Sequence, residues 1–223
     1  MLIHRWSQVQ VDDEAGPGPD CLAANERRRA PASVRLALRA AERACALAGV
    51  DPATTASVFA SEHGDLAIVD ALCRTLAGDP ALLSPMRFHH SVHNAASGYW
   101  SIATGCRAPG TALAAGAQSF AAALLEAAAQ VCADDHPVLL VHVDTAPVGP
   151  LASVVSPRTA GAQALVLGPR AQPGSRALAL ALRPAANAAP VSAQVALSAF
   201  CDEASTALEL PLHAHLSLAV TLT

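Results

Sequence analysis

The chain has 223 residues and a net charge of −4, and 52% of its residues are hydrophobic while only 3% are aromatic. This length can bury a sizeable core, which must be built from Ala, Leu and Val. The charges are scattered, and a solvated helix start explains the one basic cluster, Arg27–Arg29, so we expect no nucleic-acid partner. The uncharged run 108–125 is interrupted by Pro109 and Gly116, so we expect no membrane partner.

Six cysteines are spread along the chain without a C-x-x-C pair, and most lie among apolar neighbours. This usage predicts free thiols in a reducing compartment. The first ten residues include His4 and Arg5 and no long apolar core, so we expect no signal peptide and a cytoplasmic location.

Hydrophobic periodicity predicts strands and helices in alternation. Strands are predicted at Leu2–Val11, Thr55–Ser61, Thr111–Ala115, Pro137–Val143 and Ala162–Leu167. Helices are predicted at Val34–Ala48, Leu66–Leu76, Asn94–Ala103 and Phe120–Cys132. The alternation indicates an α/β fold in which helices flank a mixed, mostly parallel five-stranded sheet.

The pattern weakens after Gly168. Strands are predicted at Leu178–Leu182 and Leu216–Leu222, and a helix at Ser192–Leu210. We expect residues 1–223 to form a single domain with its core at about 33–168 and an extension at 169–223.

The segment Ser84–Gln130 has the densest turn punctuation in the chain. A predicted strand runs into a sharp turn at Gly116, and a helix follows directly. Several enzyme classes expose a nucleophile on such a strand–turn–helix corner. Here the corner residue is glycine, which has no side chain to offer.

Two runs in this segment, SPMRFHHSVHNAASGYWSIATG from Ser84 and APGTALAAGAQS from Ala108, resemble the amino-terminal half of β-ketoacyl synthases of the thiolase-like fold. Asn94 matches the Asn that precedes a helix in that family, and Gly116 stands where its Thr-Ala-Cys elbow carries the nucleophile. The run VFASEHGDL, from Val58, resembles an earlier strand and its turn. More narrowly, the chain resembles the short proteins called chain length factors, as in bacterial aryl-polyene clusters.

The sequence also departs from working synthases. The family's two histidines stand in His-Gly-Thr-Gly-Thr and Asn-x-Phe-Gly-Phe-Gly-Gly motifs, and neither motif occurs here; His213 and His215 lie in PLHAHLSL. Covalent acyl transfer needs a nucleophile with an activating partner. The resemblance therefore implies a catalytically silent subunit, with no catalytic residue and no cofactor.

By the same resemblance, this subunit would pair with a complete β-ketoacyl synthase in fatty-acid or polyketide-type biosynthesis, and would meet acyl carrier protein through that complex. It would shape the pocket that holds the growing acyl chain. The candidates for acyl-pocket or interface residues are His63, Leu66, Asp70, Phe88, His93, Asn94, Tyr99 and Phe120.

Two other functions stay open at this point. The chain could be a stand-alone thioesterase or acyltransferase-like enzyme that uses Cys106 or Ser119, or a non-catalytic scaffold for acyl carrier protein. We expect no metal site at His89, His90 and His93, because carboxylate partners at ligand spacing are lacking.

One further pair of titratable residues lies on the strand predicted at Pro137–Val143 and just after it. We expect His142 and Asp144 to lie on alternate faces of the strand, so that they cannot form an acid–base pair directly.

Overall fold

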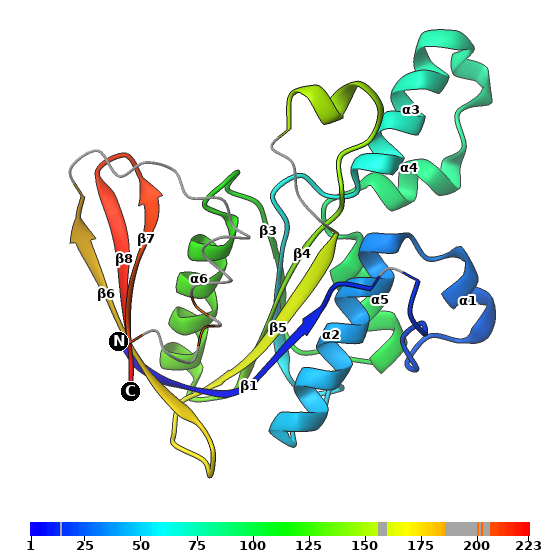
Figure 1. Ribbon diagram of the computed structural model, residues 1–223. Coiled ribbons are helices and arrows are strands. Elements are labelled where there is room, and N and C mark those ends of the chain that lie inside the picture. The colour runs from blue at the N-terminus through cyan, green and yellow to red at the C-terminus, as the bar shows by residue number, and fades with distance from the viewer. Residues whose placement is uncertain (14, 156–159, 186–199, 201, 203–205) are drawn as a thin grey trace.

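The computed structural model describes residues 1–223 except 14, 156–159, 186–199, 201 and 203–205. Its eight strands form one sheet in the order β3-β2-β4-β5-β1-β6-β8-β7 (Figure 1). The strands are β1 (Leu2–Val11), β2 (Ala56–Ala60), β3 (Gly110–Leu113), β4 (Val138–Asp144), β5 (Gly161–Gly168), β6 (Arg176–Pro184), β7 (Ala207–His213) and β8 (Leu216–Leu222). The helices are α1 (Ala24–Arg29), α2 (Ala32–Ala48), α3 (Leu66–Gly78), α4 (Pro85–Ser91), α5 (Ala95–Thr104) and α6 (Ser119–Asp134), with short 3-10 helices η1 (Pro80–Leu82) and η2 (Gly149–Ser153).

The sheet differs from the expected one in size and direction. Only β3, β2 and β4 run parallel to one another, whereas every other neighbouring pair is antiparallel. The prediction of a mostly parallel, five-stranded sheet is therefore wrong in both respects. The parallel part contains the strands that alternate with helices, because a parallel pair needs a crossover connection and an antiparallel pair does not.

The strands and helices predicted up to residue 168 are all present, with boundaries within a few residues of those predicted, whereas α1 and α4 have no counterpart among the predicted elements. In the extension, the predicted strands Leu178–Leu182 and Leu216–Leu222 lie within β6 and β8. The helix predicted at Ser192–Leu210 is wrong at its end, where residues 207–210 belong to β7, and most of its remainder lies outside the described residues.

The two faces of the sheet are covered by different helices. On one face α2 and α5 cover a core that includes Phe59, Trp100 and Val141. On the other face α6 covers a core that includes Val58 and Leu140. Successive residues of β4 point to opposite faces, which is why this whole strand is buried.

The helix α6 is enclosed on two sides by the sheet. In Figure 1 it lies between the central strands and the group β6, β8 and β7, which the bend of the sheet brings around it. One apolar cluster joins Phe120 and Leu124 of α6 to Leu180 of β6, Leu210 of β7 and Val220 of β8. The extension thus supplies the second cover of α6.

The register of β1 contains an irregularity where Trp6 lies. Between Arg5 and Ser7 the pairing with β5 shifts by one residue, so Trp6 has no partner of its own. Its indole donates a hydrogen bond to the Arg170 carbonyl, 2.7 Å away, and its ring lies against Gly168. A side-chain carbon on Gly168 would come within 2.1 Å of that ring.

Within the described part of the chain, no helix combines the length and the apolar character that crossing a membrane requires.

Candidate functional site

The carboxyl ends of the parallel strands β2, β3 and β4 meet at one end of the sheet, where α/β proteins commonly place their sites. Gly116 lies at this end with φ of +56°, in the left-handed region that favours glycine. Its Cα is exposed, and a side-chain carbon there would meet only the Gln118 amide, 3.9 Å away. The predicted corner is present, and it presents backbone to the surroundings.

Ser119, three residues later, is committed to holding this corner. Its side chain is 0% exposed, and its hydroxyl donates to the carbonyl of Gly116 at 2.7 Å and accepts from the amide of Ala115 at 2.9 Å. A hydroxyl bound in this way cannot reach a substrate. The enzyme hypothesis built on Ser119 has no support in this geometry.

Cys106 lies at the opposite end of the parallel strands. Its thiol is buried and contacts the carbonyl of Thr55, which directly precedes β2, at 3.5 Å. Gly116 follows β3 at the carboxyl end, so the length of the strands separates the two positions. Cys106 therefore does not belong to the corner.

A polar network holds the turn that follows β2. Asp144, at the end of β4, accepts hydrogen bonds from the Ser61 hydroxyl at 3.0 Å and the Glu62 amide at 2.9 Å. Ser61 in turn accepts from the amide of Gly64 at 2.8 Å. Since these groups are largely buried and paired with one another, they fix the shape of the turn.

The expectation that His142 and Asp144 lie on alternate faces is wrong. Residues two apart on a strand share a face, and Nε2 of His142 lies 3.8 Å from an Asp144 carboxylate oxygen. The His142 ring also meets the Phe120 ring edge to face, with the centroids 6.3 Å apart. The spacing in the sequence already carried this signal.

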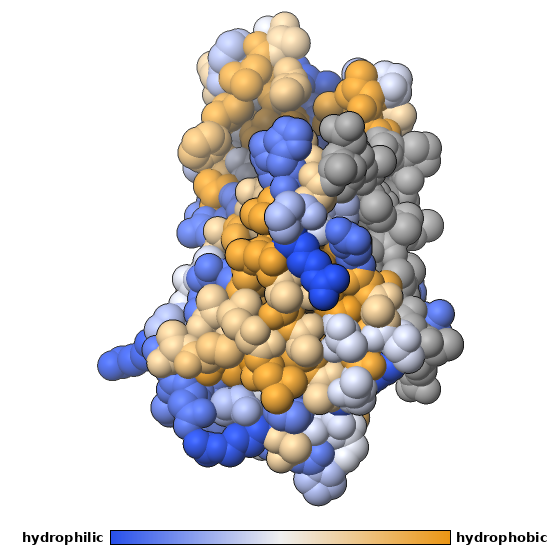
Figure 2. All heavy atoms as spheres, turned by 90° about the vertical axis from the view of Figure 1, so that its left-hand side faces the viewer, coloured by the Kyte–Doolittle hydropathy of each residue, from blue (hydrophilic) through white to orange (hydrophobic). Residues whose placement is uncertain are grey.

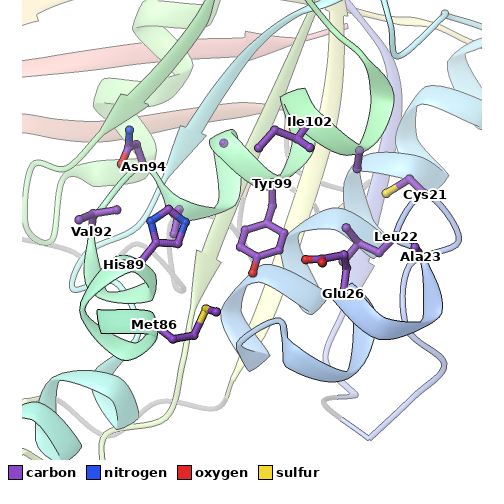
Figure 3. A pocket seen from close by; sticks show the side chains of 13 residues that line it. Cys21, Leu22, Ala23, Glu26, Met86, His89, Val92, Asn94, Tyr99 and Ile102 are labelled. Carbon is purple, nitrogen blue, oxygen red and sulfur yellow. The ribbon is translucent and has the colours of Figure 1, made fainter. Parts of the chain in front are cut away.

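A groove lies on the other helical layer, between α1, α4 and α5 (Figure 3). Its volume is about 580 Å³. Cys21, Leu22 and Glu26 line it on the side of α1, Met86, His89 and Val92 on the side of α4, and Tyr99 and Ile102 on α5. Most of these side chains are apolar, and Met86 and Ile102 are 52% and 86% exposed. Exposed apolar side chains that gather around one hollow are typical of binding surfaces.

The Tyr99 ring stands in this groove and is held from behind by α4. Its hydroxyl lies 2.9 Å from Nε2 of His90, and the two rings are 5.9 Å apart. Burial lowers the pKa of His90, as does the neighbouring His89. Burial also raises the pKa of Tyr99. Both shifts favour the neutral forms, which can share one hydrogen bond.

The predicted site residues divide between three places. Asn94 and Tyr99 line the groove, while Phe88 and His93 lie exposed on and just after α4. Leu66 and Phe120 are buried inside the chain and therefore do not form its outer surface.

The remaining two predicted residues lie around α3. His63 is exposed beside Glu62, with its Nε2 3.4 Å from that carboxylate. Asp70 forms an ion pair with Arg74 at 2.9 Å and packs against η2 near Gly149. Neither lines the groove. Among the described residues, no three His, Cys, Asp or Glu side chains gather where a metal ion could be held.

The sequence did not predict the side of the groove formed by Cys21, Leu22 and Glu26. These residues surround the start of α1, where the sequence shows only a basic cluster, and nothing local to them indicates contact with α5. Val92 did carry a signal, because it is a single aliphatic residue between the polar pairs His90-Ser91 and His93-Asn94.

The sheet edge formed by β3 lies next to α5. Backbone amides of β2 bond to the carbonyls of Pro109 and Leu113, so the odd-numbered residues of β3 face β2. The amides and carbonyls of Gly110, Ala112 and Ala114 therefore point outward. These three residues are exposed, and no other strand of the described chain pairs with them.

The opposite edge, β7, is protected. Its outward-facing positions include Glu209 and Pro211, a charge and a residue without an amide hydrogen. Proteins use such residues to prevent pairing with another chain. β3, which holds only small and aliphatic uncharged residues, has no such protection.

Comparison with known protein families identifies the family of this chain. The model of the β-ketoacyl synthase N-terminal domain matches residues 3–220. No curated protein matches the sequence.

Solved structures resemble the fold. A chain of the ketosynthase ApeO in complex with its chain length factor ApeC, from Xenorhabdus doucetiae, aligns with a TM-score of 0.77 at 19% identity, over 99% of both chains. A β-ketoacyl synthase from Burkholderia phymatum STM815 aligns with a TM-score of 0.61 at 14% identity. That alignment covers 76% of this chain and 52% of the synthase, so this chain matches about half of that protein.

Proposed function

We propose that this chain, which belongs to the β-ketoacyl synthase family by its N-terminal domain and has the thiolase-like fold, acts as a chain-length-factor-like subunit. In this role it pairs with a complete β-ketoacyl synthase and shapes the pocket for the growing acyl chain. It contributes no nucleophile of its own. The product class is of fatty-acid or polyketide type, similar to aryl polyenes, and acyl carrier protein is met through the complex.

The contrast between the two edges of the sheet is the observation that carries this proposal. An exposed strand edge with small, uncharged residues invites pairing with another strand. Here Gly110, Ala112 and Ala114 offer outward-facing backbone groups, while β7 at the other edge is protected by Pro211. A partner strand added at β3 would continue the sheet from one subunit into the other.

The groove beside this edge supports the acyl role. α5 packs against β2 and β3, so the exposed Ile102 and the groove that it borders belong to the same side of the molecule as the open edge. A subunit paired at β3 would cover part of that groove. The space between the two chains would then be apolar, which suits an alkyl or polyene chain.

The resemblance to the ApeO–ApeC complex supports the choice of partner. That complex joins a ketosynthase to its chain length factor, and its matching chain has almost the same length as this one. At 19% identity the likeness shows the fold alone. The partner synthase of this chain is therefore inferred from the open edge and the family together.

The decisive experiment replaces one outward-facing residue of β3. Ala112→Pro removes an outward-facing amide hydrogen that pairs with no other strand of the described residues, so the fold should remain intact while the edge pairs less well. The matched control is Ala207→Pro on β7, which removes an outward amide at the protected edge; the bond from the Leu222 amide to the Thr206 carbonyl shows that Ala207 faces outward.

Each variant is co-expressed with a tagged complete synthase from the same organism and then purified through the tag. We expect wild type and Ala207→Pro to be recovered with the synthase, and Ala112→Pro to be lost although circular dichroism shows it folded. Recovery of folded Ala112→Pro at the wild-type level would overturn the pairing.

The silent role has a separate test. Incubation of the isolated chain with an acyl-carrier-protein thioester should leave its mass unchanged, because Gly116 offers no nucleophile and Ser119 is occupied. A stable acyl adduct on intact-protein mass spectrometry would instead favour the enzyme hypotheses, and peptide mapping would identify its residue.

A further inference from the structure

We propose that Met86 and the hydrogen-bonded pair His90–Tyr99 form the end wall of the groove, and that this wall sets the longest acyl chain the groove accepts. The inference rests on the proposed function for the identity of the ligand. What it adds is the position in the groove at which a bound acyl chain must end.

Two separate hollows meet at this wall. The first is the groove of Figure 3, of about 580 Å³, which Met86 and Tyr99 line. The second, of about 530 Å³, lies toward α2 and α3 and is lined by Met86, His90 and Asp65 among others. Met86 borders both, and Tyr99 and His90 contribute one ring to each side. Their bond of 2.9 Å closes the boundary between the hollows.

The two hollows differ in chemistry. The groove is mostly apolar, whereas the second hollow contains Arg29, Asp65 and Arg87. An alkyl chain gains free energy for each methylene that it buries in the groove. That gain ends at the wall, because beyond it the chain would desolvate charged groups without pairing them. The wall therefore lies where the driving force for a longer chain disappears.

The wall is stiff on one side and flexible on the other. The His90 side chain is only 7% exposed and is in ring contact with both His89 and Tyr99. Turning Tyr99 aside would break its bond and leave the buried imidazole without it. Met86, at 52% exposure, is an unbranched thioether that adapts its shape easily. Met86 and the His90–Tyr99 pair therefore set the limit together, with Met86 as the adaptable part of the wall and the pair as its rigid part.

The test measures chain-length preference directly on the full chain. The probes are N-acetylcysteamine thioesters of straight-chain acids from six to sixteen carbons, which are neutral and so avoid repulsion by Glu26 at the groove. Binding is followed by the quenching of tryptophan fluorescence or by calorimetry. We expect the affinity of wild type to rise by roughly fourfold per methylene, and then to stop rising at a definite length.

Three variants locate that limit. Met86→Ala and Tyr99→Ala should move it to longer chains, and Tyr99→Phe, which keeps the ring but loses the bond, should make it less sharp. Ile102→Ala is the matched control, because Ile102 borders the groove away from the wall. It should weaken binding of every length without moving the limit.

An unchanged limit in folded Met86→Ala and Tyr99→Ala would overturn the proposal, as would a wild type that binds none of the probes. Because these measurements need no synthase, they are independent of the pairing experiment on Ala112. Recovery of folded Ala112→Pro with the synthase, together with a limit that moves, would refute only the proposed pairing. Loss of Ala112→Pro from the complex, together with a limit that stays fixed, would refute only the wall.

Discussion

Asp65 is expected to stabilise two helices at once, and its replacement by alanine should cost more than the loss of one helix cap. One carboxylate oxygen accepts a hydrogen bond from the amide of Ile68 at 3.2 Å and so caps α3. The other accepts from the Ser33 hydroxyl at 2.8 Å and, more weakly, from the Ser33 amide at 3.5 Å. Ser33 lies in the first turn of α2, whose own cap residue, Pro31, has no acceptor side chain.

The magnitude follows from these contacts. Loss of a side-chain cap costs about 1 kcal/mol, and a carboxylate near a helix N-terminus adds about 0.3–1 kcal/mol through the helix dipole. With two helices sharing the 7%-exposed Asp65, we expect Asp65→Ala to lower the free energy of unfolding by about 2–3 kcal/mol. For a chain of 223 residues this corresponds to a fall in the melting temperature of about 5–10 °C.

The measurement is thermal unfolding followed by far-ultraviolet circular dichroism at fixed protein concentration. Asp65→Asn should retain the cap of α3 and lose most of the contact with α2, so its melting temperature should lie about midway. The control is Asp79→Ala, which removes a cap from the three-residue helix η1 alone. If Asp65→Ala and Asp79→Ala lower the melting temperature equally, the two-helix role of Asp65 is refuted.

Three other changes follow from single contacts. Gly168→Ala should lower the melting temperature strongly, because the new methyl group meets the Trp6 ring, and Trp6→Ala in the same chain should recover part of the loss. Burial keeps the pKa of His90 below its ordinary 6.5, so on acidification the unfolded chain binds a proton at this histidine before the folded chain does. The free energy of unfolding should therefore fall as the pH drops below about 6.5. Urea titrations from pH 7.5 to about 5 should show this fall, and should show a smaller one for His90→Gln. Burial raises the pKa of Cys45 to about 12, so at pH 8 iodoacetamide should label the exposed Cys132 long before Cys45, and peptide mapping of equal early labelling would contradict this.

The elements of this fold could be predicted from sequence because their signals are local. The apolar stripe from Val34 to Ala48 and the nearly continuous Val and Leu of β4 each report on neighbours within one element. The turn at Gly116 was equally readable, since only glycine adopts its backbone conformation readily.

The sheet order could not be predicted in this way. β1, the first strand of the chain, lies between β5 and β6, and residues more than 150 positions apart pair there. No periodicity within β1 identifies its neighbouring strands. The alternation of strands and helices predicts a mostly parallel sheet, whereas the parallel pairing in the structure ends at β4. The groove could not be predicted for the same reason, because the segment at Leu22 meets α5 only through the packing of the whole domain.

The extension changes what should be expected of the isolated chain. If the chain ended its fold at the core of residues 33–168, the outer apolar face of α6 would be exposed to water. Such an exposed apolar face would make the isolated chain poorly soluble. Here Leu180, Leu210 and Val220 of the extension cover α6, so the free-energy cost of an exposed helix face does not arise. The apolar surface that remains includes the groove with Ile102 and the open edge with Ala112.

Self-association of the isolated chain should therefore run through β3 and depend on that edge alone. In sedimentation-velocity experiments over a range of concentrations, wild type should show a reversible dimer, since two β3 edges can pair with each other in the absence of the synthase. Ala112→Pro should sediment as a monomer, and Ala207→Pro should behave as wild type does. A dimer that persists in Ala112→Pro would place the contact elsewhere, with the exposed face of β6 and β8 seen in Figure 2 as the next surface to vary, beginning at Ala179. A purely monomeric wild type would refute self-association through the β3 edge.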